Sequence, residues 1–148
     1  MNIAISRTCG YGFRPSLGSV LSRKNILGHG APSQFPPLPV LGDGLTTSGK
    51  KLVHACNDRN ILVDLSQIPE KGFWDVARVS KAPLVATHSN AHALCTSPRN
   101  LTDRQLAAIR DTKGMVGLNF ATCFLRQDGN MGRDTAIELM VRELDYLI

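Results

Sequence analysis

The feature that most constrains the fold is a threefold alternation between an apolar stretch that ends in polar residues and a helix-like segment. The apolar stretches are residues 61–67, 84–89 and 115–120. Strands that alternate with helices are typical of a parallel sheet, and parallel β/α proteins carry their functional groups at the carboxyl ends of the strands. The sequence therefore predicts about three β/α units, with their polar strand ends along one edge of the sheet.

Helix starts are predicted from capping residues and from proline. Four of them are expected, at Ser48, at Pro69, at Thr102 with Gln105, and at Thr135 with Glu138. In the last helix, Ile137 and Val141 belong to the apolar positions that recur at helical spacing.

Two regions differ in character. Residues 1–42 are rich in Gly and Pro and show little periodicity, so we expect them to be irregular. Residues 43–148 hold the β/α pattern, but a complete (β/α)8 barrel needs about 250 residues. A three-stranded open sheet leaves an unpaired edge, which is an aggregation hazard. We therefore expect self-association through this edge.

Composition excludes several classes of protein. The net charge of +5 arises mainly from the first 50 residues, where basic side chains are scattered among Gly, Pro and Ser, so nucleic-acid binding is disfavoured. No run approaches the roughly 20 apolar residues of a membrane span. The start of the chain lacks the apolar segment of a secretory signal, which makes a cytoplasmic location the expectation. The four cysteines form no C-x-x-C pair and are expected to be reduced and mostly buried.

Histidine at a strand end is the first candidate for chemistry. His88 stands where barrel enzymes place metal ligands and bases, although a buried histidine bonded to the neighbouring backbone fits the position equally well. His92 follows four residues later and could form a helical metal pair with His88. His54 is expected on a helix surface and His29 in a Gly-rich loop.

Three other polar residues follow or interrupt the predicted strands. Arg99 could form a forked contact with a substrate carboxylate, or it could cap loop carbonyls. Asp64 lies within an apolar run, so its carboxylate must be compensated, either structurally or as part of a site's outer shell. Asn119 ends the third predicted strand and could line the same mouth. The sequence contains no nucleophile elbow, P-loop or dinucleotide fingerprint.

Several ordered motifs resemble the membrane (renal) dipeptidase family. They are the segments 63–67 (VDLSQ), 80–91 (SKAPLVATHSNA), 99–103 (RNLTD) and 117–120 (GLNF). The resemblance covers roughly residues 43–148, and residues 1 to about 40 do not share it. It implies a partial (β/α)8 barrel of the amidohydrolase-like type, about three β/α units long, from a two-zinc enzyme that hydrolyses dipeptides.

The resemblance also implies roles for three residues. His88 corresponds to a histidine that ligates one of the two zinc ions, and Arg99 to the arginine that holds the terminal carboxylate of the dipeptide. Gln67 stands where the family has a second histidine ligand to the same ion. A neutral amide oxygen is a weak substitute for imidazole on zinc. Gln67 is therefore expected to be a degraded ligand position.

Other family ligands have no counterpart in the matching region. They are an amino-terminal His-x-Asp pair, a glutamate that bridges the zinc ions and a late aspartate near the catalytic water. A two-metal hydrolase needs its ions to polarise the carbonyl and to supply hydroxide. The sequence therefore predicts an inactive part of a zinc dipeptidase. The alternative is a non-catalytic interaction or peptide-binding protein derived from that family.

Overall fold

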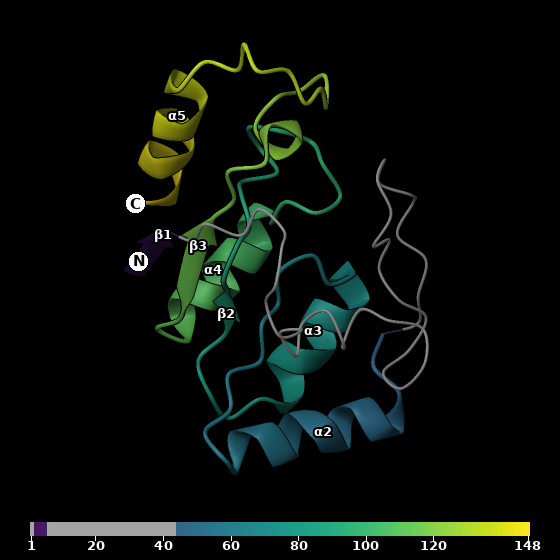
Figure 1. Cartoon of the computed structure of the whole chain (residues 1–148). Helices are drawn as coiled ribbons and strands as arrows, with labels where there is room; N and C mark the ends of the chain where they lie inside the picture. The colour runs from purple at the N-terminus through teal and green to yellow at the C-terminus, as the bar shows by residue number, and fades with distance from the viewer. Residues whose placement is uncertain (1, 6–43) are drawn as a thin grey trace.

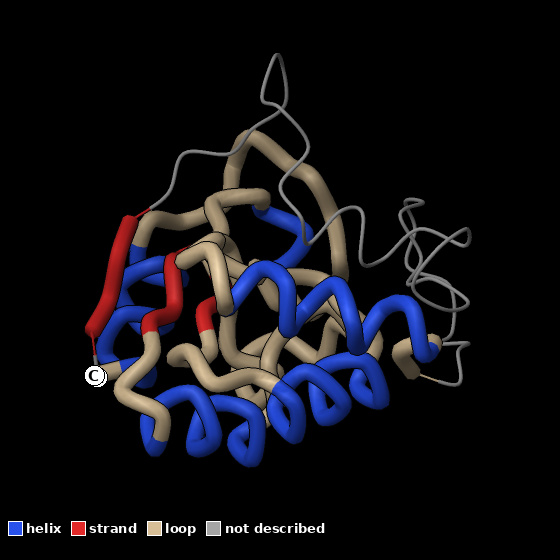
Figure 2. Tube along the Cα trace, turned by 90° about the horizontal axis from the view of Figure 1, so that it is seen from below, coloured by secondary structure: helices blue, strands red, loops and turns tan. Residues whose placement is uncertain are grey.

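The computed structural model describes residues 2–5 and 44–148 as a mixed α/β arrangement, shown in Figure 1. Its three strands are β1 (Asn2–Ile5), β2 (Val85–Ala86) and β3 (Met115–Leu118). Both β1 and β2 pair with β3 in parallel, which gives the strand order β1-β3-β2. Figure 2 shows the three strands side by side with helices packed around them. The parallel α/β class predicted from the sequence is confirmed.

The first predicted strand, over residues 61–67, is wrong in extent. Only Asp64 forms a bridge, to Val85, and the adjacent Leu65 N–H donates to the Val85 carbonyl at 2.8 Å. Upstream, the Ile61 N–H is still bonded to the Cys56 carbonyl at the end of a helix. Downstream, Gln67 has a φ of +62°, which turns the backbone out of the extended conformation. The parallel pairing is therefore confined to the middle of the apolar run.

Strand β1 corrects the expectation of irregular structure over residues 1–42. Asn2 aligns with Met115 and Ile5 with Leu118, so β1 runs along the side of β3 opposite to β2. Its alternating isoleucines suit a strand, and the side of β3 offers backbone groups that need partners. β3 is thus the central strand of the described sheet. The remainder of residues 1–42 lies outside the described residues, as does His29.

Four α-helices and one short 3-10 helix complete the described part. They are α2 (Thr47–Asn57), α3 (Glu70–Val79), α4 (Asp103–Asp111), α5 (Glu138–Leu147) and η1 (Thr122–Phe124). Helix α2 packs on α3, whereas α4 and α5 contact β3. No helix in the described ranges combines the length and apolarity that a bilayer crossing requires.

Two of the predicted helix starts need correction. Thr46, rather than Ser48, caps α2, and its hydroxyl accepts from the Gly49 N–H at 3.1 Å. The box expected from Thr135 and Glu138 does not form, because the Thr135 hydroxyl donates to the Gly132 carbonyl instead. Pro69 immediately precedes α3, close to its predicted place in the first turn.

The face of α5 that turns inward also differs from the prediction. Ile137 and Val141 are 69% and 49% exposed, whereas Glu143 and Leu147 are buried. The hydrophobic core lies between the strands and helices α2, α3 and α4. Its most deeply buried apolar side chains include Val53, Leu65, Phe73, Val76, Ile109, Val116, Leu118 and, from α5, Leu147.

The capping box of α4 is present as predicted and permits a test of local stability. The Gln105 side-chain oxygen accepts from the N–H of Thr102 at 2.9 Å and from its hydroxyl at 3.0 Å. We expect Gln105→Leu to lower the free energy of unfolding by about 1 kcal/mol, because the Thr102 N–H loses its acceptor. Urea denaturation measures this value. Gln105→Glu, which keeps the acceptor and suits the helix amino terminus, is the matched control and should cost far less.

Candidate functional site

The buried carboxylate of Asp64 organises the edge of the sheet where polar residues follow β2. Asp64 is 1% exposed, and its Oδ1 atom accepts from the Ser66 N–H, the Ser66 hydroxyl and the Thr87 N–H at 3.0, 2.7 and 3.0 Å. Its Oδ2 atom accepts from the Thr87 hydroxyl at 2.6 Å. These four bonds compensate a charge that would otherwise be costly to bury. Asp64 therefore joins the segment before α3 to the end of β2.

His88 lies directly beside this network. Its Nδ1 atom is 2.8 Å from the Thr87 hydroxyl oxygen and 3.7 Å from Asp64 Oδ2, and its backbone N–H donates to the Ser66 hydroxyl at 2.9 Å. The single hydroxyl proton of Thr87 is donated to Asp64, so the Thr87 oxygen can only accept a hydrogen bond from the Nδ1–H group of His88. The neutral imidazole is therefore the Nδ1–H tautomer. Its Nε2 atom keeps a lone pair, the state in which a histidine can ligate a metal ion.

The surroundings also favour the neutral form of His88. Burial, the largest effect, lowers the pKa of the imidazole; the nearby Asp64 charge opposes this, and the Arg99 charge adds to it. A histidine with a lowered pKa is neutral at pH 7. The imidazole is bonded through Thr87 rather than directly to a backbone carbonyl, which sets it apart from the buried-histidine alternative.

Arg99 reaches the same edge from the loop that follows β2. Its Nη1 donates to the Gln67 side-chain oxygen at 2.8 Å, and its guanidinium carbon lies 5.7 Å from the centre of the Phe124 ring. Burial lowers the pKa of Arg99, with a smaller opposing effect from Cys123. An arginine nevertheless stays charged in proteins. The structure thus brings His88, Gln67 and Arg99 to one edge, as the sequence predicted.

Asn119 does not line the mouth of the site. It is 7% exposed, its side-chain oxygen accepts from the Ala121 N–H, and its backbone N–H donates to Asn90. Sequence reasoning missed Asn90 and Asn100, two buried amides that both donate to the Phe124 carbonyl and hold the loops after β2 and β3 together. Their position in the sequence could have indicated a role at the site, since Asn90 lies two residues after His88 and Asn100 directly follows Arg99.

The histidine pair proposed for His88 and His92 is wrong, because residues 88–92 are not helical and the His92 N–H donates to the Leu101 carbonyl. His54 is exposed on α2, as predicted. Across residues 44–148, no group of three or more His, Cys, Asp or Glu side chains could hold a metal ion. The described residues by themselves therefore do not supply a complete set of zinc ligands.

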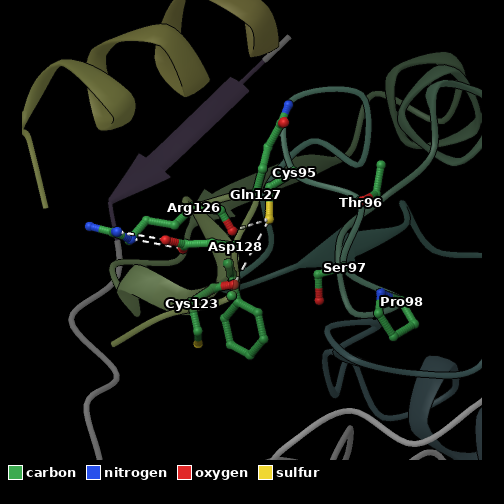
Figure 3. Close-up of a pocket in the computed structure, with 10 residues that line it drawn as sticks. Cys95, Thr96, Ser97, Pro98, Cys123, Arg126, Gln127 and Asp128 are labelled. Carbon is green, nitrogen blue, oxygen red and sulfur yellow. Dashed lines mark hydrogen bonds and ion pairs between the residues drawn. The ribbon is translucent and has the colours of Figure 1, made fainter. Parts of the chain in front are cut away.

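A pocket of about 300 Å³ adjoins this edge, between the segments 95–98 and 123–129 (Figure 3). Phe124, whose ring lies under the Arg99 guanidinium, contributes to its wall. The volume is at the lower end of the range for small-molecule sites. The pocket is thus large enough for a short side chain.

The environment of the cysteines around this pocket favours the protonated thiol. Cys95 and Cys123 are free and buried, and burial is the main effect that raises the pKa of each thiol. The Cys95 thiol donates to the Arg126 carbonyl at 3.2 Å, one of the bonds drawn in Figure 3. Protonated thiols are poor nucleophiles. Cys56 is also free and buried, as predicted, and Cys9 lies outside the described residues.

Solved structures with the same fold define the class of protein. A crystal structure of a metallopeptidase of family M19, dipeptidase AC, superimposes with a TM-score of 0.81 at 59% identity, over 88% of this chain and 39% of that one. A metallopeptidase from Rhodobacter sphaeroides, solved with a phosphinate mimic of the dipeptide L-Ala-D-Ala, has a TM-score of 0.76 at 60% identity, over 82% and 35% of the two chains. Both are metallopeptidases.

The family follows from the sequence comparison. Residues 17–148 match the family model described as membrane dipeptidase (peptidase family M19), so this chain belongs to that family. The match begins at residue 17, whereas the motifs that resemble the family were expected only from Asp43 onward. An uncharacterised protein in the pqqA 5′ region of Klebsiella pneumoniae is 50% identical over 133 residues, which are 90% of this chain and 49% of that protein. The chain spans about half the length of this relative. Members of the family are metal-dependent peptidases.

Proposed function

We propose that residues 43–148 are part of the (β/α)8 barrel of a zinc-dependent dipeptidase, with His88 as a metal ligand and Arg99 as the group that holds the substrate carboxylate. The observation that carries the proposal is the Asp64–Thr87–His88 hydrogen-bond chain, which leaves the Nε2 atom of His88 deprotonated. Carboxylates and hydroxyls that are hydrogen-bonded to the second ring nitrogen of a ligating histidine orient the ring in this way. The Arg99 guanidinium on the same edge supplies the charge that a carboxylate requires.

The substrate class is proposed from the relatives. The Rhodobacter sphaeroides metallopeptidase was solved with a mimic of L-Ala-D-Ala, and dipeptides with a free carboxylate are the substrates that an arginine at this position fits. The pocket of about 300 Å³ beside Phe124 suits a small side chain at the carboxyl end. We therefore take L-Ala-D-Ala as the test substrate.

The chain by itself is proposed to be inactive. A zinc ion shared by His88 and the amide of Gln67 would be held weakly, because amide oxygens are poor zinc ligands beside imidazole. We expect no zinc-dependent hydrolysis of L-Ala-D-Ala above the buffer rate, and no zinc retained after dialysis. His88→Ala and added chelator are the controls. Hydrolysis that disappears in both controls would contradict the proposed inactivity and would show that the chain assembles a complete site.

The second candidate is a non-catalytic interaction or peptide-binding protein derived from the dipeptidase family. Exposed apolar side chains favour it: Ile61 and Leu62 lie beside the Asp64 bridge with 45% and 50% exposure, and Ile137 is exposed at the start of α5. Such groups favour association. Light scattering on the purified protein tests the expected self-association, which a monodisperse monomer would contradict. For either candidate function we propose a cytoplasmic location.

A further inference from the structure

A second pocket, of about 610 Å³, opens between α3 and the first turn of α4. Its wall combines cationic, aromatic and small apolar side chains, namely Lys71, Trp74, Asp75, Ala77, Arg78 and Arg104. None of these lining residues belongs to the edge that carries His88 and Arg99, so this pocket is separate from the candidate site. Its volume lies within the range of small-molecule sites.

The aromatic residue of this pocket holds a guanidinium in place. Four of the lining residues share one face of α3, at positions 71, 74, 75 and 78. Arg104 approaches this face from α4, and its guanidinium carbon lies 5.3 Å from the centre of the Trp74 ring. The indole is itself fixed, because its Nε1–H donates to Glu70 Oε1 at 3.2 Å and its ring packs at 79° to the ring of Phe73. Trp74 therefore gives the Arg104 guanidinium a defined position at the pocket.

Arg104 keeps its hydrogen-bond donors for a ligand. Within the described part of the chain its guanidinium forms no hydrogen bond and no ion pair, and its side chain is exposed. Stacking on an aromatic face uses the π-surface of a guanidinium and leaves the N–H groups in its plane free to bind an anion. Arg104 is thus oriented without being neutralised.

The charges of the lining groups also favour an anion. Asp75 supplies the carboxylate among the described lining residues, and it is 6% exposed. Both of its oxygens have partners, since Oδ2 accepts from the Leu45 N–H at 2.7 Å and Oδ1 accepts from Arg78. One carboxylate stands against three cationic side chains. The excess of positive charge suits a ligand with two negative charges better than a ligand with one.

We propose that this pocket binds a small phosphate monoester through Arg104 and Arg78. A phosphate monoester carries a charge of about −1.5 to −2 at pH 7 and three acceptor oxygens, which match the forks of two guanidinium groups. The organic group of the ester lies against the apolar surface of Trp74 and Ala77. This ligand differs in charge from the single carboxylate at the end of a peptide, and its binding does not depend on the proposed peptidase function.

Trp74 is the only tryptophan of the chain, so its fluorescence reports on this pocket. Phenyl phosphate is titrated at constant ionic strength and neutral pH, and the dissociation constant is taken from the fluorescence change and, independently, from calorimetry. We expect saturable binding that is about tenfold tighter than that of benzoate, which carries a single charge. Inorganic phosphate, which lacks the organic group, should also bind more weakly than phenyl phosphate.

Two variants assign the binding to this pocket. Arg104→Gln should weaken the binding of phenyl phosphate about tenfold, because the neutral amide cannot form a charge-assisted fork. Arg110→Gln removes an exposed arginine from the same helix but outside this pocket, and is expected to leave the dissociation constant nearly unchanged. Circular dichroism checks the fold of both variants.

Each contrary outcome overturns a definite part of the proposal. No saturable binding of phenyl phosphate, or the same dissociation constant in the wild-type chain and Arg104→Gln, would refute the site. An equal loss in Arg110→Gln would show that only the general charge of the surface attracts the anion. Benzoate that binds as tightly as phenyl phosphate would refute the phosphate class, and inorganic phosphate that binds as tightly would refute the contact of the organic group with Trp74.

Discussion

Replacing Asp64 with alanine is expected to lower the free energy of unfolding by about 3–5 kcal/mol. The carboxylate accepts four hydrogen bonds from Ser66 and Thr87, including two from backbone N–H groups. A buried N–H that loses its acceptor costs about 1–3 kcal/mol, and here there are two of them in addition to two hydroxyls. Urea denaturation monitored by circular dichroism measures the loss. A reduction below 1 kcal/mol would show that water replaces the carboxylate at little cost.

Asp64→Asn is the matched variant, because it separates stability from the state of His88. The amide oxygen can still accept from both backbone N–H groups, so the expected loss is only about 1–2 kcal/mol. The amide nitrogen, however, donates to the Thr87 hydroxyl, which then turns its own proton toward His88 Nδ1. The imidazole would become the Nε2–H tautomer and could no longer offer Nε2 to a metal ion.

Nitrogen NMR of labelled histidine reports this tautomer directly. We expect Nδ1–H for His88 in the wild-type chain and Nε2–H in Asp64→Asn. An unchanged tautomer in the variant would contradict the relay through Thr87, even if the stability values agreed with expectation.

The sequence predicted the parts of the fold that depend on local pattern. The strand at residues 115–118 and the capping box at Thr102 depend on neighbouring residues, and both occur where they were expected. The pairing of β1 with β3 could not be predicted, since Asn2 and Met115 are brought together only by tertiary structure. The predicted extent of the first strand was wrong, because an apolar run does not reveal that the residue at its end, Gln67, has a left-handed backbone conformation.

In the candidate site, too, the features that depend on local sequence were predicted and those that depend on tertiary structure were not. The position of His88 at a strand end and that of Arg99 in the following loop were visible in the sequence, and the structure brings both residues to one edge. The bond between Arg99 and Gln67 was not visible, because it joins residues 32 positions apart and depends on the direction of a turn. The inward-facing Glu143 was missed for a related reason, since a charged residue between apolar positions is normally assigned to the solvent face of a helix.

Stability is expected to fall by about 3–4 kcal/mol as the pH rises from about 4 to 8, through the titration of Glu143. This carboxyl group is 1% exposed on α5, and its Oε2 accepts from the Ala91 N–H at 2.8 Å. Its buried Oε1 has no hydrogen-bond partner among the described residues. Burial is the main cause that raises its pKa to about 7, against the bond from Ala91 and the charge of Arg142.

The sign of this pH dependence follows from the numbers of protons that the folded and the unfolded chain bind. The unfolded chain releases the Glu143 proton near the ordinary glutamate pKa of about 4.3, whereas the folded chain keeps it until about pH 7. Between these values the folded state binds more protons, so the stabilisation is complete below about pH 4 and is lost as the pH rises through 7. The raised pKa, converted at about 1.4 kcal/mol per pH unit, gives an effect of about 3–4 kcal/mol.

Comparison with Glu143→Gln isolates this contribution from that of other titrating groups, including Cys95 and Tyr146, whose thiol and phenol sense the Glu143 charge. Urea denaturation from pH 4.5 to 8.5 should show the wild-type chain losing stability relative to the variant by about 3 kcal/mol. Glu138→Gln, which removes an exposed carboxylate from the same helix, is the control for charge alone. A pH-independent difference between the wild-type chain and Glu143→Gln would contradict the burial of Glu143 against Ala91.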